Sequence, residues 1–168
     1  MNMSAAHASK PAKSPYITAE GYRVLEGETK AIWKRRAEVT RALSAAAAEG
    51  DRSENAEYIY RKKELREIDW RIRYLQKRMP DLRIVDSAPT DRARIFFGAW
   101  VTLLDEQDID MAFRIVGPDE LDPKRGLVSM DAPLARAMMG RSVDDEVVVQ
   151  APGGQKRYWI LEVSYDSP

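Results

Sequence analysis

Apolar residues recur every seven positions along the first half of the chain, and they alternate with polar residues along much of the second half. In residues 18–49 the repeat consists of Leu25, Ile32, Val39 and Ala46. A repeat of this length places the apolar side chains on one stripe of an α-helix. Thr18 fits the N-cap position, and Gly50 fits the position just past the C-terminus. We therefore expect one long helix from Thr18 to Glu49.

The stretch after Gly50 has a second seven-residue repeat. It consists of Tyr58, Leu65, Ile72 and Met79, with Ile68 and Leu75 at the alternate positions. Spacings of three and four residues are typical of a coiled-coil seam, and Pro80 ends the pattern. Two long helices joined by a few residues must lie antiparallel. The first half therefore predicts a coiled-coil hairpin.

The second half predicts strands and one short helix. Strands are expected over 95–104, 112–117, 126–130, 145–150 and 157–165. A helix is expected over 131–140, with Asp131 as its N-cap and Gly140 as its stop. Trp159, Leu161, Val163 and Tyr165 alternate, which predicts that they share one face of the last strand, and Trp100 and Trp159 are expected in the core.

The resulting fold class is α+β, with a helical hairpin followed by a small α+β domain. The predicted organisation is a disordered tail (1–15), the hairpin (16–82), a linker (83–92) and the second domain (93–168).

Composition narrows the possible chemistry. The chain of 168 residues has no cysteine and one histidine, His7, so thiolate metal sites and histidine triads are excluded. No apolar run reaches the roughly 20 residues that a membrane span needs, and we expect a cytoplasmic protein. The net charge is zero, yet residues 1–90 hold 18 Lys/Arg and 13 Asp/Glu, against 9 and 14 in the remainder. This asymmetry predicts two modules with different partners.

Acids gather at the connection between the two helices. They are Glu49, Asp51, Glu54 and Glu57, and eight Lys/Arg follow within residues 61–78. Asp51 and Glu54 have the spacing of a capping box, and Ser53 could be the cap instead; by spacing alone this structural interpretation is the commoner one. The alternative is that the two carboxylates form half of a Mg²⁺ site beside a helix that attracts phosphates.

Several stretches resemble the bacterial transcript cleavage factors GreA and GreB. "EGDRSENAEYIYRKKELREIDWRIRYL" is similar to the tip and second helix of their coiled coil. "FFGAWV", "RIVGPDE" and "SMDAPLARAMMGRSVDDEVVV" are similar to their C-terminal domain. The resemblance runs from about Tyr16 to the end, "GDRSEN" is its most specific part, and "RSENAEYIY" before a basic helix favours the GreB-like branch.

The resemblance implies a fold and a function. The hairpin would enter the secondary channel of a backtracked bacterial RNA polymerase, and a C-terminal FKBP-like domain would hold the factor at the channel rim. The factor would stimulate the polymerase's own cleavage of the RNA 3′ end and rescue arrested complexes. It would be a monomer with no stand-alone enzyme activity.

The resemblance also implies roles for individual residues. Asp51 and Glu54 would be donated to a second Mg²⁺ shared with the polymerase. The tip would be supported by Ser53, Asn55 and Tyr58. The residues that would follow the nascent RNA 3′ segment are Arg61, Lys62, Lys63, Arg66 and Arg73. Asp131 and Pro133 would contact the rim, although an N-cap followed by a first-turn proline is an equally good interpretation of these two.

Other interpretations stay open at this point. An inhibitory Gre homologue would occupy the channel without promoting cleavage, and a coiled-coil adaptor would use the acids only as caps. Trp33, Trp70 and Tyr74 mark either a contact surface or packing against a neighbouring domain. Trp70 is unusual for the family.

Overall fold

The computed structural model describes residues 11–50 and 55–167. The chain divides into two compact units. The helical unit is Ile17–Asp86, and the sheet unit takes in Ser87–Pro168 together with the N-terminal segment up to Tyr16.

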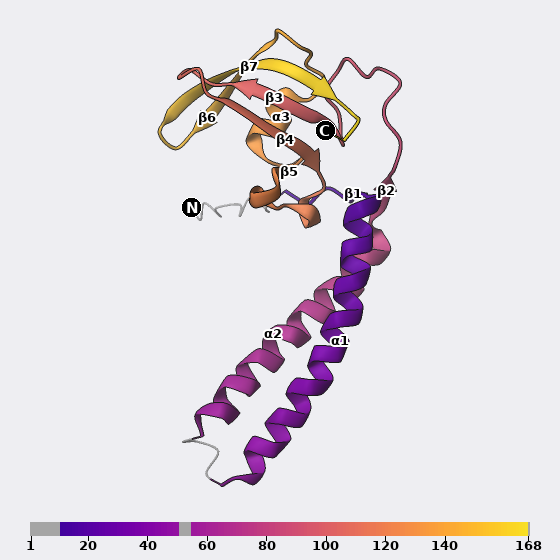
Figure 1. Ribbon diagram of the computed structural model, residues 1–168, viewed down its shortest axis with the longest axis vertical. Coiled ribbons are helices and arrows are strands. Elements are labelled where there is room, and N and C mark those ends of the chain that lie inside the picture. Colours follow the sequence, from indigo (N-terminus) through magenta and orange to yellow (C-terminus); the bar gives the residue numbers. More distant parts are fainter. Residues whose placement is uncertain (1–10, 51–54, 168) are drawn as a thin grey trace, which may run out of the picture. The chain divides into compact units, whose positions relative to one another are not determined.

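The helical unit is built on a hairpin of two long helices (Figure 1). Helix α1 spans Ala19–Ala48 and α2 spans Ala56–Arg78, followed by a 3₁₀ turn, η1, at Met79–Asp81. Thr18 caps α1, because its hydroxyl oxygen accepts a hydrogen bond from the Gly21 amide at 3.0 Å. Gly50 has a φ of 125°, a backbone conformation that favours glycine. The predicted first helix, its cap and its stop are confirmed.

The predicted seam holds the two helices together in two apolar clusters. The first contains Ile17, Leu25 and Leu75, with Tyr22, Tyr74, Met79 and Leu82 packed around them. The second contains Val39, Ile68 and Ile72, with Ile32 and Leu65 packed around them. Both clusters are made of the side chains that the seven-residue repeats selected, together with a few neighbours. Their separation leaves a stretch of seam between them that is packed less completely.

Ion pairs between α1 and α2 border the seam. Arg71 binds Glu28 through two nitrogens, at 2.6 and 3.0 Å, and Arg35 binds Glu64 at 2.7 Å. Moving seven residues forward on α1 therefore corresponds to moving seven residues back on α2, as antiparallel helices require. Arg36 and Asp69 add a third pair at 2.7 Å.

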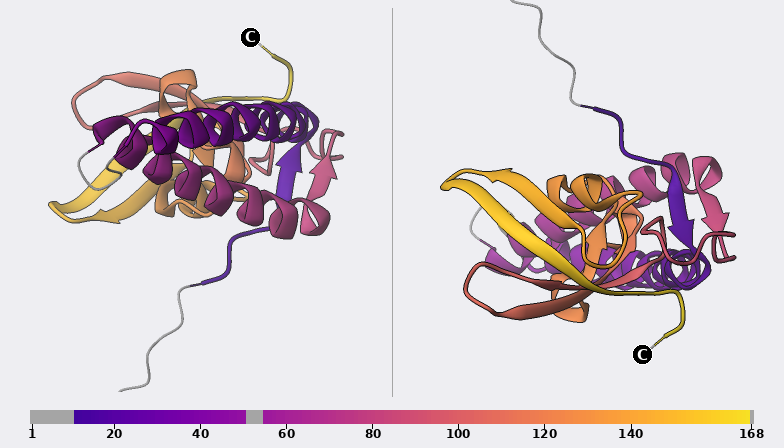
Figure 2. Two further views of the ribbon diagram at one scale, coloured as in Figure 1. Left: turned by 90° about the horizontal axis from the view of Figure 1, so that it is seen from below. Right: turned by 90° about the horizontal axis from the view of Figure 1, so that it is seen from above.

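A small sheet lies at the base of the hairpin, and the sequence did not predict it. Strand β1 (Tyr16–Thr18) pairs with β2 (Arg83–Val85) (Figures 1 and 2). Residues 83–85 were expected to begin a linker. Both strands have three residues, too short for an alternating pattern to be recognised, so only their meeting in space identifies them.

The sheet unit contains one five-stranded sheet with the order β5-β4-β3-β7-β6. The strands are β3 (Trp100–Leu104), β4 (Asp110–Val116), β5 (Leu127–Ser129), β6 (Glu146–Ala151) and β7 (Gly154–Ser164). Strands β4 and β5 are parallel and the other neighbours are antiparallel. Two 3₁₀ turns, η2 (Pro118–Glu120) and η3 (Pro123–Arg125), lie between β4 and β5.

Helix α3 (Pro133–Met138) packs on this sheet through Ala135 and Met138, which are fully buried. The rest of the buried core is Ile95, Ala99, Val101, Leu103, Phe113, Ile115, Val147 and Ile160. The α+β class is therefore confirmed, while likeness to the FKBP fold stays a prediction. In the described part of the chain, no helix combines the length and the apolar character needed to cross a membrane.

The last strand differs from the prediction because it contains a bulge. The register of β3 against β7 pairs Thr102 with Glu162 but Leu103 with Ile160, so Leu161 is an extra residue. An extra residue reverses which side chains face the core. Ile160 is accordingly fully buried, whereas Leu161 is 46% exposed. The single face predicted for Trp159, Leu161, Val163 and Tyr165 is therefore wrong.

Two further predictions in this unit are corrected. Trp100 and Trp159 are only half-buried and lie outside the core cluster. The guanidinium carbon of Arg114 lies 5.7 Å from the centre of the Trp100 ring. The first predicted strand begins at Trp100 and not at residue 95, because Gly98 adopts a φ of 87° and interrupts the extended chain.

Candidate functional site

The connection between α1 and α2 is where the sequence places the candidate catalytic acids. Helix α1 ends at Ala48, with Glu49 as its C-cap, and α2 begins at Ala56. Asp51, Ser53 and Glu54, which carry the predicted metal-binding and tip-supporting roles, lie outside the described residues.

Asn55 caps the second helix. Its side-chain oxygen accepts a hydrogen bond from the Tyr58 amide at 3.1 Å, and its side-chain nitrogen donates to the Ala46 carbonyl at 2.9 Å. The interpretation that gave the N-cap to Asp51 or Ser53 is therefore wrong. Asn55 can do more than either, because an amide both accepts from α2 and donates to the end of α1. Capping of α2 does not require the acids.

The predicted RNA-binding residues fall into two groups on α2. Arg61 binds Glu57 at 2.7 Å and Glu64 at 3.0 Å, and Lys62 lies 5.9 Å from the centre of the Tyr58 ring. These two cations are already engaged within the hairpin. Arg61 has a structural role in addition to any contact with a ligand.

The second group faces solvent. Lys63, Arg66 and Arg73 are exposed, and none of them pairs with an acid among the described residues. Unpaired cations on one helix provide a positive surface that attracts a polyanion. The structure thus divides one sequence-predicted set into cations that stabilise the hairpin and cations that are available to a partner.

Glu64 joins the two helices electrostatically. Partial burial raises the pKa of its carboxyl group, but hydrogen bonds and charges from Arg35 and Arg61 have the larger combined effect, and the pKa lies below its ordinary value. Glu64 is therefore charged when the hairpin is folded and serves as a fixed link between α1 and α2.

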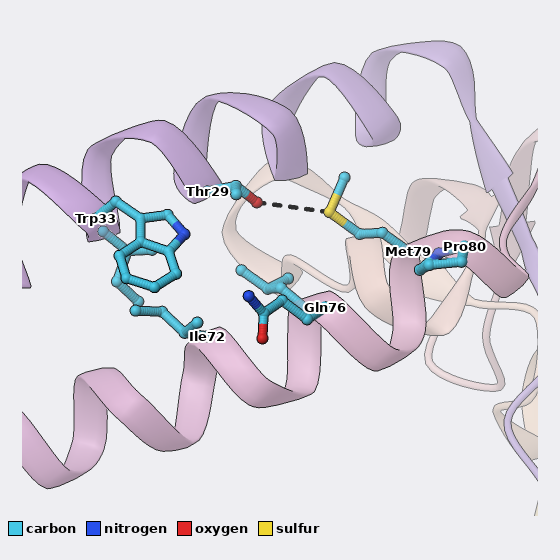
Figure 3. Close-up of a pocket in the computed structure, with 8 residues that line it drawn as sticks. Thr29, Trp33, Ile72, Gln76, Met79 and Pro80 are labelled. Carbon is cyan, nitrogen blue, oxygen red and sulfur yellow. Dashed lines mark hydrogen bonds between the residues drawn. The ribbon is translucent and has the colours of Figure 1, made fainter.

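A pocket of about 170 Å³ lies between α1 and α2 and is lined by residues of both apolar clusters (Figure 3). Its lining residues are Thr29, Ile32, Trp33, Ile72, Leu75, Gln76, Met79 and Pro80. The Thr29 hydroxyl donates to the Leu25 carbonyl at 2.9 Å and lies 3.5 Å from the Met79 sulfur. No charged side chain lines the pocket, so it is a gap in helix packing rather than a site for an ionic ligand.

An aromatic pair on α2 was not recognised as a unit from the sequence. The rings of Trp70 and Tyr74 are parallel within 15°, with 6.3 Å between their centres. Their spacing of four residues was the available signal, because residues i and i+4 of a helix are neighbours.

The predicted docking residues lie beside α3. Asp131 does not cap this helix: the N-cap is Ala132, and Pro133 occupies the first helical position, which suits its missing N–H. The Asp131 carboxylate instead accepts hydrogen bonds from the amide and hydroxyl of Ser14. Ser14 belongs to the segment expected to be disordered, and a separation of 117 residues left no local signal for this contact.

Comparison with known proteins assigns the chain to a family. The model for the transcription elongation factor GreA/GreB N-terminal region matches residues 15–84, and the model for the C-terminal region matches residues 89–165. The chain belongs to the GreA/GreB family. The two matched regions of this transcription elongation factor family correspond closely to the helical unit and to the main part of the sheet unit.

Individual relatives agree with this assignment. The chain is 56% identical to the transcription elongation factor GreB of Yersinia pestis over 155 residues, which cover 92% of this chain and 91% of the relative. It is 51% identical to GreB of Pseudomonas aeruginosa over 164 residues, covering 97% and 98%. The solved structure of GreA factor homolog 1 from Thermus thermophilus covers 90% of this chain and 99% of its own at 20% identity, with a TM-score of 0.42, and the assignment does not depend on it.

The GreB-like prediction is therefore confirmed at the level of the family. No three or more acidic or histidine side chains gather as a metal site in the described ranges 11–50 and 55–167. In this GreA/GreB chain, the sequence-predicted Mg²⁺ ligands remain Asp51 and Glu54, in the connection between the helices.

Proposed function

We propose that this chain enters the secondary channel of bacterial RNA polymerase and stimulates the polymerase to cleave the 3′ end of backtracked RNA. Cleavage would return an arrested complex to elongation. The chain would supply ligands and position, while the bond would be broken in the polymerase, so the factor has no enzyme activity alone. This proposal extends the family assignment to a mechanism.

The observation that carries the proposal is the position of the two acids relative to the hairpin. The helices have 30 and 23 residues, or roughly 45 and 35 Å at 1.5 Å per residue. Asp51 and Glu54 lie in the sequence between the helix ends, and Asn55 caps α2 in their place. A narrow hairpin with acids at its turn suits the delivery of carboxylates into a channel.

The donor chemistry of the turn suits a shared Mg²⁺. Carboxylate oxygens are ligands that Mg²⁺ prefers, but two of them do not complete its octahedral shell. Asp51 and Glu54 would hold the ion together with groups of the polymerase. When bound, such an ion stabilises negative charge and orients water at a phosphodiester. The part of this chain would be to bring both carboxylates to the reacting phosphate at the end of a stiff arm.

Two surfaces would guide the factor to its position. The exposed cations Lys63, Arg66 and Arg73 would follow the extruded RNA 3′ segment, because cations on a helix face neutralise successive phosphates. In the sheet unit, which we expect to be FKBP-like, Asp131 and Pro133 would contact the channel rim. Asp131 would do so while accepting hydrogen bonds from Ser14. A monomer is sufficient for each of these roles.

Purified backtracked complexes provide the test. Adding the chain with Mg²⁺ should release short 3′ RNA fragments, and Asp51→Asn or Glu54→Gln should abolish release while co-elution with polymerase is kept. Each change removes a charged ligand with almost no change in shape. Glu49→Gln is the matched control, since Glu49 is the C-cap of α1 through its backbone and should retain activity. Undiminished cleavage by both tip variants would reject the mechanism.

The same assay distinguishes the alternatives. Slower nucleotide addition without RNA fragments would identify an inhibitory homologue that occupies the channel. No co-elution with polymerase would identify an adaptor for other proteins. Of these three possibilities, only a cleavage factor is expected to release RNA fragments in a way that depends on both Asp51 and Glu54.

A further inference from the structure

We propose that Trp70 and Tyr74, here called the stacking pair, form a platform on which unpaired bases of RNA stack. The proposal rests on the proposed function, which brings an RNA 3′ segment to α2. It adds a second kind of contact, because the cations of α2 recognise phosphates whereas the stacking pair would recognise base faces.

The geometry of the stacking pair favours a planar ligand. Trp70 is 64% exposed, although indole is among the largest apolar side chains. Its ring lies nearly parallel to that of Tyr74, at 15° with 6.3 Å between centres, which is an offset stack. Tyr74 is half-buried, so the exposed ring of Trp70 supplies most of the flat surface that a ligand can reach. A base has a flat π-face of matching chemistry.

Contacts within the hairpin fix the position of Tyr74, one member of the stacking pair. Tyr74 is half-buried and packs against the cluster of Ile17, Leu25 and Leu75. The Arg71 guanidinium lies 5.2 Å from the centre of the Tyr74 ring and is itself fixed by its double hydrogen bond to Glu28 of α1. Because Tyr74 is anchored, Trp70 has a defined surface to stack on and loses less conformational freedom when a base binds.

The surroundings of the stacking pair are positively charged. Lys63, Arg66, Arg73 and Lys77 lie seven and four residues before Trp70 and three and seven residues after it. Side chains at these spacings share one face of a helix. All four cations are exposed, and none pairs with an acid among the described residues. Glu67 is the acid within the same stretch of this face.

This combination of charge and aromatic surface selects a single-stranded polynucleotide. An apolar protein partner would cover Trp70, but it would leave four cations without counter-charges. A double helix would satisfy the cations, but its bases are already stacked and cannot reach the rings. Single-stranded RNA offers phosphates to the cations and bases to the rings at once.

Binding of a fluorescein-labelled oligouridine to the full-length chain tests the proposal. Trp70→Ala should weaken binding about tenfold at every salt concentration, whereas Trp70→Phe, which keeps a ring, should recover most of the affinity. Arg73→Ala should instead reduce the steepness of the salt dependence, because one phosphate contact is lost. Loss of affinity with an unchanged salt slope is the signature of stacking.

Trp33→Ala is the matched control. Trp33 is a 47% exposed tryptophan on α1, and its removal should leave oligouridine binding unchanged. Helical circular dichroism of each variant excludes unfolding as the cause. Equal affinity of Trp70→Ala and the unchanged chain would overturn the proposal, as would the absence of any oligouridine binding by the unchanged chain.

The cleavage assay separates this inference from the proposed function. If the unchanged chain releases RNA fragments and Trp70→Ala does so at the same concentrations, the stacking pair has no role but the function stands. If the unchanged chain releases no fragments, the proposed function fails, and oligouridine binding still decides whether the platform exists. Trp70→Ala is expected to need about ten times more protein for half-maximal cleavage, with the same maximal rate.

Discussion

Asn55 shows how much of the hairpin depends on one side chain. Its amide group accepts a hydrogen bond from the first turn of α2 and donates one to the Ala46 carbonyl near the end of α1. The residue therefore caps one helix and ties it to the other at the position where the chain reverses. The N-cap of α2 is therefore Asn55 and not the position that the spacing of the acids suggested.

Replacement of Asn55 separates these two bonds. Asn55→Ala should lower the free energy of unfolding by about 1–2 kcal/mol, because the cap is lost and the Ala46 carbonyl loses its donor. Asn55→Asp should have a smaller effect, since a carboxylate still caps a helix but cannot donate. Urea denaturation followed by helical circular dichroism measures both. Equal losses for the two variants would show that the bond to Ala46 contributes all of the stability.

The hairpin as an element depends on apolar packing and on charge pairs at its edges. The apolar seam divides into two clusters with a pocket between them, so packing alone leaves part of the contact incomplete. Ion pairs between α1 and α2 fix the same register as the seam. Glu64 is central among them because it binds both Arg35 and Arg61.

Stability of the hairpin should depend on the charge of Glu64. The pKa of this carboxyl is lowered from its ordinary value of 4.5 in the folded chain. Its contribution is therefore complete above that ordinary value and is lost as the pH falls through the lowered pKa. Glu64→Gln should cost no more than about 1 kcal/mol at neutral pH, and the cost should decrease as the pH falls below 4.5 and through the lowered pKa.

Urea denaturation across this pH range measures the difference between Glu64→Gln and the unchanged chain. Glu67→Gln is the control, because Glu67 is exposed and makes no ion pair with any described residue. A difference that did not decrease as the pH fell below 4.5 would show that Glu64 acts through packing and not through charge.

At the scale of the whole molecule, the chain passes between its two units twice. It leaves the sheet unit at Tyr16, forms the helical unit and returns at Ser87. The N-terminal segment is held to the rest of the sheet unit by Ser14, which binds Asp131, and by Tyr16, whose ring lies 6.3 Å from that of Phe97.

Gly117 packs closely against the backbone of Tyr16, the second residue that holds the N-terminal segment. A Cβ atom at Gly117 would lie 1.9 Å from the Tyr16 carbonyl oxygen, which is well inside van der Waals contact. The φ of Gly117 is −71°, which any residue adopts, so the close approach alone requires glycine. Gly117→Ala should displace the segment, cost about 1–3 kcal/mol and accelerate tryptic cleavage after Lys13.

Gly153→Ala is the matched control for this change. A Cβ atom at Gly153 would meet nothing within 4 Å, so both the melting temperature and the rate of cleavage after Lys13 should stay unchanged. If Gly117→Ala cleaves at the control rate, the contact between Gly117 and Tyr16 does not hold the segment.

The long helices and most of the strands could be predicted from the sequence, because they depend on repeats within neighbouring residues. The seam, Thr18 as a cap and Gly50 as a stop follow from local spacing. The chemistry of the turn was also readable, since a pair of acids before a basic helix is a local pattern. Their roles stay predictions, because Asp51 and Glu54 lie outside the described residues.

Features that depend on distant partners, or on a choice between neighbouring residues, could not be predicted from local spacing. The sequence pattern placed the cap of α2 at Asp51 or Ser53, whereas Asn55 caps this helix and bonds both Tyr58 and Ala46. The bulge at Leu161 depends on pairing with β3. The Asp131 carboxylate accepts a hydrogen bond from Ser14 instead of capping its own helix. Each of these outcomes depends on the relative free energies of contacts between residues that are distant in the sequence. A local sequence pattern does not contain those free energies.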